Sequence, residues 1–122
     1  MRISEAESVV MELLWRRSPL GADEVVSALG VAQDWQEPTI KTLLNRLLKK
    51  GAIAATKDGR RFLYAPVFKR VDWVQHESEG LLDRLFGGRV APLVAHFSER
   101  RKLGKKDIAE LKRLIAEIDN EN

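Results

Sequence analysis

Hydrogen-bonding and cationic side chains are interspersed with leucines between residues 39 and 50. The polar members of this stretch are Thr39, Lys41, Thr42, Asn45, Arg46, Lys49 and Lys50. Asparagine and arginine carry the groups that bind adenine and guanine edges through paired hydrogen bonds, and threonine can contact a thymine methyl. Threonine and lysine also bind phosphate oxygens. This set of side chains is typical of nucleic-acid recognition.

A second group of cations, Lys57, Arg60 and Arg61, surrounds the dipeptide Asp58-Gly59. An Asp-Gly pair between two β-compatible segments predicts a hairpin, here with strands over residues 52–56 and 61–65. The three cations would then lie at the turn, where they can reach the DNA backbone or the minor groove. Such contacts mainly set affinity and register, whereas a helix in the major groove reads sequence.

Residues 38–50 must form a helix if the first group of polar side chains is to share a face. Pro38 suits the first helical position, and Gly51 suits the position after the last. At about 100° per residue, the apolar side chains fall in one arc of roughly 140° and the polar side chains fill the remainder. The apolar arc contains Ile40, Leu43, Leu44, Leu47 and Leu48. A helix with one such cationic face fits the major groove of B-DNA.

The residues before this helix predict two more helices. Ser4–Glu7 forms a capping box ahead of an apolar run, which indicates a helix over residues 5–16. A short extended piece precedes a second helix over residues 22–29, with Gly30 just past its end and residues 31–37 as the turn. The order helix, short strand, helix, helix, strand, basic turn, strand is that of a winged helix-turn-helix domain.

Three further amphipathic helices are predicted between residues 71 and 118. About fifty residues with narrow apolar stripes do not easily close a core alone, so they need a partner surface. The most economical partner is a second copy of the chain. The predicted dimer contacts are Val74, Leu81, Leu82, Leu85, Leu93, Phe97, Ile108, Leu111, Ile115 and Ile118. We therefore expect a mainly α fold, with a winged-helix domain over residues 1–68 and a three-helix dimerisation domain over residues 69–122.

Positive charge is concentrated in the stretch that holds both groups of cations. The chain has 122 residues and a formal net charge of +3. Residues 37–70 carry nine Lys/Arg against two Asp/Glu, a net charge of +7, whereas residues 1–36 carry −3 and residues 71–122 carry −1. Concentrated positive charge on a small domain favours a polyanionic partner, most simply double-stranded DNA.

The composition disfavours several other classes of protein. The chain has no cysteine, which excludes disulfides and cysteine-based metal sites. It has no Gly-rich phosphate loop, nucleophile elbow or His-carboxylate cluster, so neither an enzyme nor a cofactor or metal site is predicted. No apolar run approaches the length of a bilayer crossing, and residues 1–8 lack a signal-peptide core. We therefore expect a cytoplasmic protein without membrane insertion.

The motifs also carry a family resemblance. In chain order they read SEAESVVMELLW, TIKTLLNRLLKKGAI, GRRFLYAP, LLDRLFGG, PLVAHFSE and DIAELKRLI. Over almost the whole chain these segments resemble the penicillinase-repressor family of winged-helix regulators, of the BlaI, MecI and CopY types. The resemblance implies a homodimeric repressor of palindromic operators with TACA/TGTA-type half-sites, often controlling β-lactamase or other resistance or stress genes. It places the foremost DNA contacts at Thr39, Lys41, Thr42 and Arg46, and the wing at residues 57–61.

Two features depart from the family pattern. Copper-responsive members have a cysteine hook near the C-terminus, and this chain has no cysteine, so that mode of sensing is excluded. In members paired with a membrane sensor-protease, repression ends when an Asn-Phe bond in the dimerisation domain is cut. The matching position here is His96-Phe97, which keeps the aromatic residue and not the asparagine. This bond is the candidate cleavage site for a sensor-protease or a downstream protease.

Two other functions are consistent with parts of this pattern. A winged helix used only for protein–protein contact would expose apolar or mixed-charge side chains on its third helix, whereas here the exposed face is cationic or neutral polar. A regulator whose DNA binding is modulated by a small ligand at the dimer interface would show the same sequence features, and it is kept as the alternative.

Overall fold

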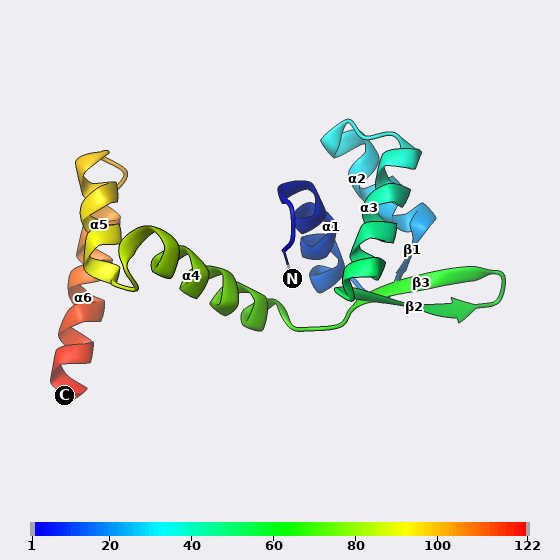
Figure 1. The fold of residues 1–122 in the computed structure, drawn as a ribbon. Coiled ribbons are helices and arrows are strands. Elements are labelled where there is room, and N and C mark those ends of the chain that lie inside the picture. The colour runs from blue at the N-terminus through cyan, green and yellow to red at the C-terminus, as the bar shows by residue number, and fades with distance from the viewer. Residues whose placement is uncertain (1, 122) are drawn as a thin grey trace. The chain divides into compact units, whose positions relative to one another are not determined.

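The computed structural model describes residues 2–121 and contains two compact units (Figure 1). The first unit ends at Gln75, and the second begins at His76. The described residues form six helices and one three-stranded sheet, which confirms the prediction of a mainly α fold. The sheet lies in the first unit, and the second unit is helical.

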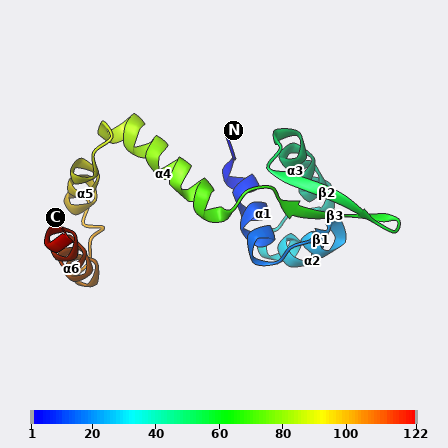
Figure 2. The same ribbon diagram turned by 90° about the horizontal axis from the view of Figure 1, so that it is seen from below.

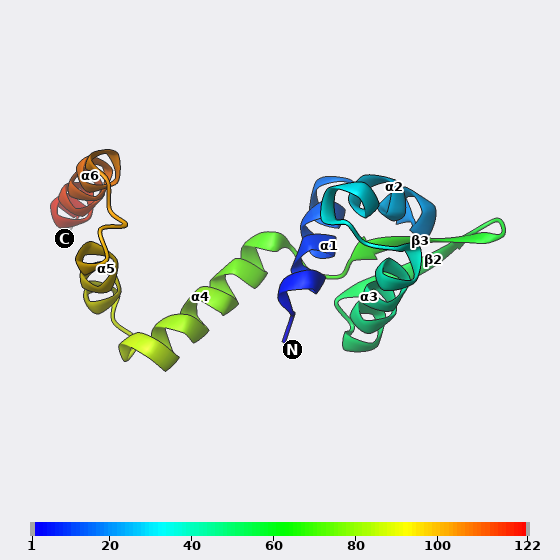
Figure 3. The same cartoon turned by 90° about the horizontal axis from the view of Figure 1, so that it is seen from above.

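The first unit has the element order of a winged helix-turn-helix domain. Its elements before residue 70 are α1 (Glu5–Arg16), β1 (Leu20–Gly21), α2 (Ala22–Gln33), α3 (Glu37–Lys50), β2 (Ile53–Asp58) and β3 (Arg61–Pro66). The sheet is antiparallel, with strand order β1-β3-β2. The β2–β3 hairpin extends past the three helices as a wing (Figures 2 and 3). This is the order that the sequence predicts.

The three helices and the base of the sheet enclose one hydrophobic core. Its buried apolar side chains are Val10, Met11, Leu13, Leu14, Leu20, Val25, Leu29, Ile40, Leu43, Leu44, Leu47, Ala52 and Ile53. Removing these side chains from water is the main favourable term that holds α3 against α1 and α2. Trp35 and Tyr64 pack against the core from its edge.

Backbone groups at two helix ends are satisfied as the sequence predicts. The Glu7 amide donates to the Ser4 hydroxyl at 3.1 Å, and the Ser4 amide donates to the Glu7 carboxylate at 3.0 Å, which completes the capping box of α1. At the end of α3, Gly51 has a φ of 74° and its amide donates to helix carbonyls. Glycine is favoured at this left-handed position. These caps fix the start of α1 and the end of α3.

The prediction that α2 ends before Gly30 is wrong. The helix continues to Gln33, and Asp34 is the residue that turns left-handed, with a φ of 54°. The amides of Asp34 and Trp35 both donate to the Gly30 carbonyl. The predicted turn over residues 31–37 is therefore shorter, because α3 already begins at Glu37. Aspartate enters the left-handed region more readily than most residues, so it takes the place expected of glycine.

The hairpin turn is tighter than the sequence predicts. β2 runs to Asp58, which pairs with Arg61, so the turn consists of Gly59 and Arg60 alone. Gly59 has a φ of 65° and Arg60 does not have a positive φ, which matches a type II′ turn. Lys57 therefore lies within the strand, opposite Phe62 of β3.

Three helices follow the wing, as predicted. They are α4 (Arg70–Phe86), α5 (Val90–Glu99) and α6 (Lys105–Glu121). α4 ends in two left-handed glycines, and the Gly88 amide donates to the Leu82 carbonyl at 2.9 Å. Within the described single chain, no residue of these three helices is fully buried. None of the helices within residues 2–121 has both the length and the apolar character of a membrane-crossing segment.

The start of α4 belongs to the first unit and packs on α1. The rings of Trp73 and Trp15 have centroids 5.4 Å apart, and the Trp15 indole donates to the Phe68 carbonyl at 2.9 Å. The Arg70 guanidinium lies 2.9 Å from the Glu12 carboxylate. The first turns of α4 are therefore held to the helix that supports α3.

Candidate nucleic-acid interface

The polar face of α3 is exposed along its whole length. The seven side chains on it that are predicted to contact DNA all lie at the surface: Thr39, Lys41, Thr42, Asn45, Arg46, Lys49 and Lys50. The opposite face, with Ile40, Leu43, Leu44 and Leu47, is buried in the core. The predicted division of the helix into a core face and a polar face is confirmed, and the polar face is accessible to a partner.

Four cations on α3 and the wing are unpaired within the part of the chain that the structure describes. They are Arg46, Lys49, Lys57 and Arg60. Two of them lie on α3 and two on the hairpin, all exposed. Unneutralised charges on neighbouring elements of one domain sum to a positive potential that attracts a polyanion.

Two predicted contact residues near the start of α3 are held by their own helix. The Lys41 ammonium lies 3.1 Å from the Glu37 carboxylate one turn earlier, and both side chains are more than half exposed. An exposed pair of this kind contributes little, so a phosphate can displace the glutamate. The Thr42 hydroxyl donates to the Pro38 carbonyl at 2.9 Å, which leaves its oxygen as an acceptor and its methyl group exposed.

Lys50 is engaged more firmly than the other cations of α3. Its ammonium lies 2.6 Å from the Glu7 carboxylate and 2.7 Å from the Arg2 carbonyl oxygen. Burial by itself raises the pKa of Glu7, but hydrogen bonds from Lys50 and Ser4, together with the lysine charge, outweigh burial and lower that pKa below its usual value. Lys50 therefore neutralises a buried carboxylate, and the phosphate contact predicted for it would require breaking this pair.

Arg61 is also engaged within the domain. Its guanidinium lies 3.2 Å from Glu24 and 3.8 Å from Asp23, both in the first turn of α2. Its Nε lies 4.0 Å from Asp58 across the hairpin turn. Glu24 in turn accepts a hydrogen bond from the Gly21 amide at 3.1 Å. These exposed pairs are weak individually, and together they connect the wing to the start of α2.

A small hollow lies between the polar face of α3 and β3. It has a volume of about 120 Å³ and is lined by Ala22, Lys41, Leu44, Asn45 and Tyr64. Two of the predicted DNA contacts, Lys41 and Asn45, therefore adjoin the half-buried ring of Tyr64. Tyr64 therefore lies beside two of the predicted DNA contacts and also packs against the core.

The helices after the wing expose much of the surface that is predicted to form a dimer. In the described chain, nine of the twelve exposed large apolar side chains lie in α4, α5 and α6. Six of the ten predicted dimer contacts are among these nine: Leu81, Leu85, Phe97, Ile108, Ile115 and Ile118. The other four, Val74, Leu82, Leu93 and Leu111, are half-buried in the single chain. Exposed apolar surface of this extent marks an interaction surface.

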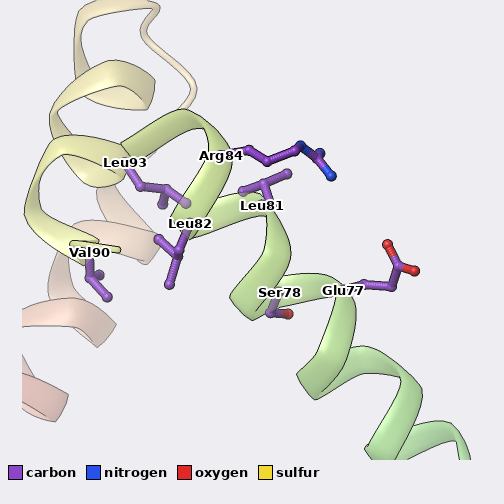
Figure 4. Close-up of a pocket in the computed structure, with 7 residues that line it drawn as sticks. All are labelled: Glu77, Ser78, Leu81, Leu82, Arg84, Val90 and Leu93. Carbon is purple, nitrogen blue, oxygen red and sulfur yellow. The ribbon is translucent and has the colours of Figure 1, made fainter. Parts of the chain in front are cut away.

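A hollow between α4 and α5 gathers part of this apolar surface (Figure 4). It has a volume of about 400 Å³ and is lined by Glu77, Ser78, Leu81, Leu82, Arg84, Val90 and Leu93. Leu82 and Leu93 point toward one another from the two helices, whereas Glu77 and Arg84 extend away from them. The hollow is therefore apolar at its centre and charged at its rim.

The candidate cleavage bond, between His96 and Phe97, lies inside α5. The His96 ring has its centroid 6.0 Å from that of Phe86 and 5.3 Å from that of Phe97. A bond in a helix is not in the extended conformation that strand-type peptide recognition requires, so cleavage there needs α5 to unwind. α5 has only ten residues and starts without a side-chain cap, and short helices are marginally stable on their own.

Glu7 and Glu24 pair with cations that are predicted to contact DNA, and the sequence does not predict these roles beyond their places at helix starts. The sequence does indicate that Glu7 is buried. At about 100° per residue it falls inside the apolar arc of α1, between Leu14 and Met11. A carboxylate at such a position needs a cationic partner. That partner is 43 residues away, so no local pattern identifies it. No cluster of three or more His, Cys, Asp or Glu side chains suited to a metal ion occurs within residues 2–121.

Comparisons with known proteins agree with this architecture. The model of the penicillinase repressor family matches residues 3–117. The penicillinase repressor of Bacillus licheniformis is 35% identical over 119 residues, which are 98% of this chain and 93% of that protein. The methicillin resistance regulatory protein MecI of Staphylococcus aureus (strain N315) is 31% identical over 113 residues, which are 93% of this chain and 92% of that protein.

The chain is also similar to solved structures. One of them is the solution structure of the Bacillus licheniformis BlaI monomeric form in complex with the blaP half-operator, with a TM-score of 0.53 and 40% identity, covering 59% of this chain and 88% of that one. The matched relatives are repressors and regulatory proteins, not enzymes, in agreement with the sequence prediction. Because the family model and both relatives match nearly the full length, the chain belongs to the penicillinase repressor family.

Proposed function

We propose that this chain is a cytoplasmic transcriptional repressor that binds a palindromic operator as a homodimer. The polar face of α3 enters the major groove, with Asn45 and Arg46 at base edges. The observation that carries the proposal is the exposed cationic face of α3 beside a wing whose Lys57 and Arg60 are unpaired within residues 2–121. A winged helix used only for protein contact would present apolar or mixed-charge side chains on this face.

A second copy of the chain covers the apolar faces of α4, α5 and α6 in this proposal. Leu85, Ile115 and Ile118 are 63%, 59% and 57% exposed in the single chain. Burying a side chain of this type contributes about 1.5–3 kcal/mol. A dimer also doubles the phosphate contacts and presents two α3 helices to half-sites one helical turn, or a multiple of it, apart. The half-sites proposed are of the TACA/TGTA type that the family resemblance implies.

Selection from a pool of randomised duplexes tests the proposal. The chain is incubated with the pool at fixed salt, bound duplexes are amplified over several rounds, and the enriched sequences are compared. We expect an inverted repeat with TACA/TGTA-type half-sites, bound more tightly than a single half-site or a scrambled duplex. Enrichment of no sequence, or of one without two-fold symmetry, would contradict the proposal.

Cleavage within α5, at or beside His96-Phe97, is the proposed route to release of the operator. It is carried out by a membrane sensor-protease or a protease downstream of it. A cut there separates α6, and with it Ile115 and Ile118, from the rest of the chain. A chain that stops at His96 should therefore sediment as a monomer and bind the operator weakly, whereas a stable truncated dimer would contradict this route.

A ligand-modulated regulator is the second candidate function. The hollow between α4 and α5 favours it, because a volume of about 400 Å³ lies within the range of small-molecule sites. A ligand that binds there and controls repression should raise the melting temperature and change operator affinity together. A screen of small apolar compounds that finds stabilisation without any change in operator affinity would count against this function.

A further inference from the structure

One partly buried ion pair ties the end of α3 to the start of α1. The ammonium of Lys50, the last residue of α3, lies 2.6 Å from Oε1 of Glu7 and 2.7 Å from the Arg2 carbonyl oxygen. Among the described residues, Glu7 is the one buried charged side chain, with 2% of its surface exposed. Its second oxygen, Oε2, is buried without a hydrogen-bond partner in that part of the chain. The carboxylate therefore depends on Lys50 for its neutralising charge.

Both members of the pair are fixed by the structure around them. The capping box with Ser4 holds the Glu7 carboxylate at the first turn of α1. The Lys50 side chain is 34% exposed, so most of its stem is covered while its head reaches the carboxylate. The chain then turns at Gly51 into Ala52, which is fully buried. A shift of the end of α3 large enough to separate Lys50 from Glu7 would also disturb the packing of Ala52.

We propose that Glu7 is a positioning residue for DNA recognition that acts through Lys50. The ion pair fixes the C-terminal end of α3 and keeps the Lys50 charge away from the DNA. Lys50, which the sequence assigns to phosphate, is then a structural cation, and Arg46 and Lys49 are the cations that DNA meets on this part of α3. The inference rests on the proposed function, in which the polar face of α3 enters the major groove.

Removing the charge of Glu7 has two effects that a simple loss of stability does not have. Lys50 becomes free to bind phosphate, and each added phosphate contact steepens the dependence of log K on log salt by about 0.9. The end of α3 also loses its fixed position, and a misplaced base contact lowers discrimination about tenfold. Loss of stability alone lowers the folded fraction equally for every duplex, so it changes neither the salt slope nor the discrimination.

The test compares the full-length parent with Glu7→Gln, which keeps the size of the side chain and removes its charge. Affinity for the selected operator and for a scrambled duplex of equal length is measured at salt concentrations from about 50 to 200 mM. We expect a salt slope steeper by about 0.9 and an operator-to-scrambled affinity ratio about tenfold lower. Glu5→Gln is the matched control, because it removes an exposed carboxylate from the same turn of α1 and should leave both quantities unchanged.

Lys50→Met provides the reciprocal measurement. Its salt slope should equal that of the parent, whereas Lys49→Met should lower the slope by about 0.9. The double variant Glu7→Gln/Lys50→Met replaces the ion pair with two neutral side chains and should also keep the parent slope. If circular dichroism shows that either single variant does not fold, the salt slope of the double variant still tests the inference.

Three results would overturn the inference. They are a Glu7→Gln variant with the parent slope and the parent affinity ratio, a Lys50→Met slope lowered as much as that of Lys49→Met, and a lowered slope in the double variant. In each case the parent still binds its operator, so the proposed function stands. If the parent itself binds no operator, the proposed function fails.

Discussion

Arg46 and Lys50 lie one turn apart on α3, carry the same charge and have different surroundings. Lys50 is paired with a buried carboxylate on α1, whereas Arg46 is exposed and makes no ion pair within residues 2–121. Arginine also has a planar fork that binds guanine through two parallel hydrogen bonds. The role of a cation on this helix therefore depends on the neighbouring helix as much as on its own position in the sequence.

At the residue scale, Arg46→Ala should weaken operator binding by about 1–3 kcal/mol, the value of one good base contact. Its effect on a scrambled duplex should be smaller, because only one phosphate-attracting charge is lost there. Lys49→Ala is the comparison, and it should weaken binding to both duplexes equally. Gel-shift titrations at several salt concentrations measure the affinity of each variant for the operator and for the scrambled duplex. An Arg46→Ala variant that binds its operator as tightly as the parent at every salt concentration would contradict the assignment of α3 as the recognition helix.

The Glu7–Lys50 pair should also make the free energy of unfolding depend on pH in the acid range. The folded-state pKa of Glu7 is lowered, so its carboxylate stabilises the fold above the ordinary glutamate pKa of about 4.3, and this contribution is lost as pH falls through the folded-state pKa. Glu7→Gln should lower the free energy of unfolding by about 1.5–3 kcal/mol at neutral pH. Urea unfolding should show that this difference shrinks at lower pH. A difference that stays constant down to the acid limit would contradict the ion pair.

The exposed residues of α3 could be predicted from the sequence because they follow a period of about 3.6 within one helix. The ion pairs of Lys50 and Arg61 could not be predicted from the sequence, because their partners Glu7 and Glu24 lie 43 and 37 residues away. Local spacing carries no information about which helix start lies beside which cation. That information exists only after α1, α2 and α3 have packed.

At the scale of elements, α2 shows how two local signals compete. Gly30 is a favoured residue for a helix end, and it precedes a polar stretch. Val31 is 95% exposed, so the last turn of α2 has no buried apolar residue there to mark its continuation. The helix instead ends at Asp34, whose left-handed backbone lets its own amide and that of Trp35 donate to helix carbonyls. Helix ends are least predictable where packing does not decide between two candidate residues.

Gly30→Ala tests this assignment of the end of α2. A Cβ on Gly30 would lie 3.5 Å from the Trp35 carbonyl oxygen and 3.8 Å from Val26, which are ordinary contacts. Because glycine inside a helix is less favourable than alanine, the substitution should stabilise the domain by about 0.5–1 kcal/mol. Thermal or urea unfolding measures the change. Destabilisation would indicate that residue 30 needs the freedom of glycine, as the sequence prediction assumes.

The wing should contribute affinity without sequence preference. Lys57→Ala combined with Arg60→Ala removes two unpaired cations from the hairpin, so binding to operator and scrambled duplexes should weaken alike. The salt slope should fall by about 1.8, since each phosphate contact contributes about 0.9. Lys112→Ala combined with Arg113→Ala on α6 removes the same charge away from the wing and serves as the control. A slope unchanged by the wing substitutions would exclude the hairpin from the DNA contact.

At the scale of the whole molecule, the helices after the wing expose apolar side chains that a second copy would cover. Leu85→Asp and Ile115→Asp each place a charge on this surface and should shift sedimentation from dimer to monomer. Affinity for the full operator should fall, while affinity for a single half-site stays close to that of the parent. Val31→Asp, on the highly exposed end of α2, is the control. A Leu85→Asp or Ile115→Asp variant that remains dimeric would place the interface elsewhere.

The most direct test of symmetric recognition by α3 is a hydroxyl-radical footprint on the operator selected by the parent chain. The account predicts two protected stretches on one face of the duplex, related by a dyad and spaced by one helical turn of about 10 base pairs or a multiple of it. At a protein concentration that just saturates the parent footprint, Arg46→Ala should weaken the protection of both stretches together. A single unsymmetric stretch, or protection unchanged by Arg46→Ala, would contradict the account.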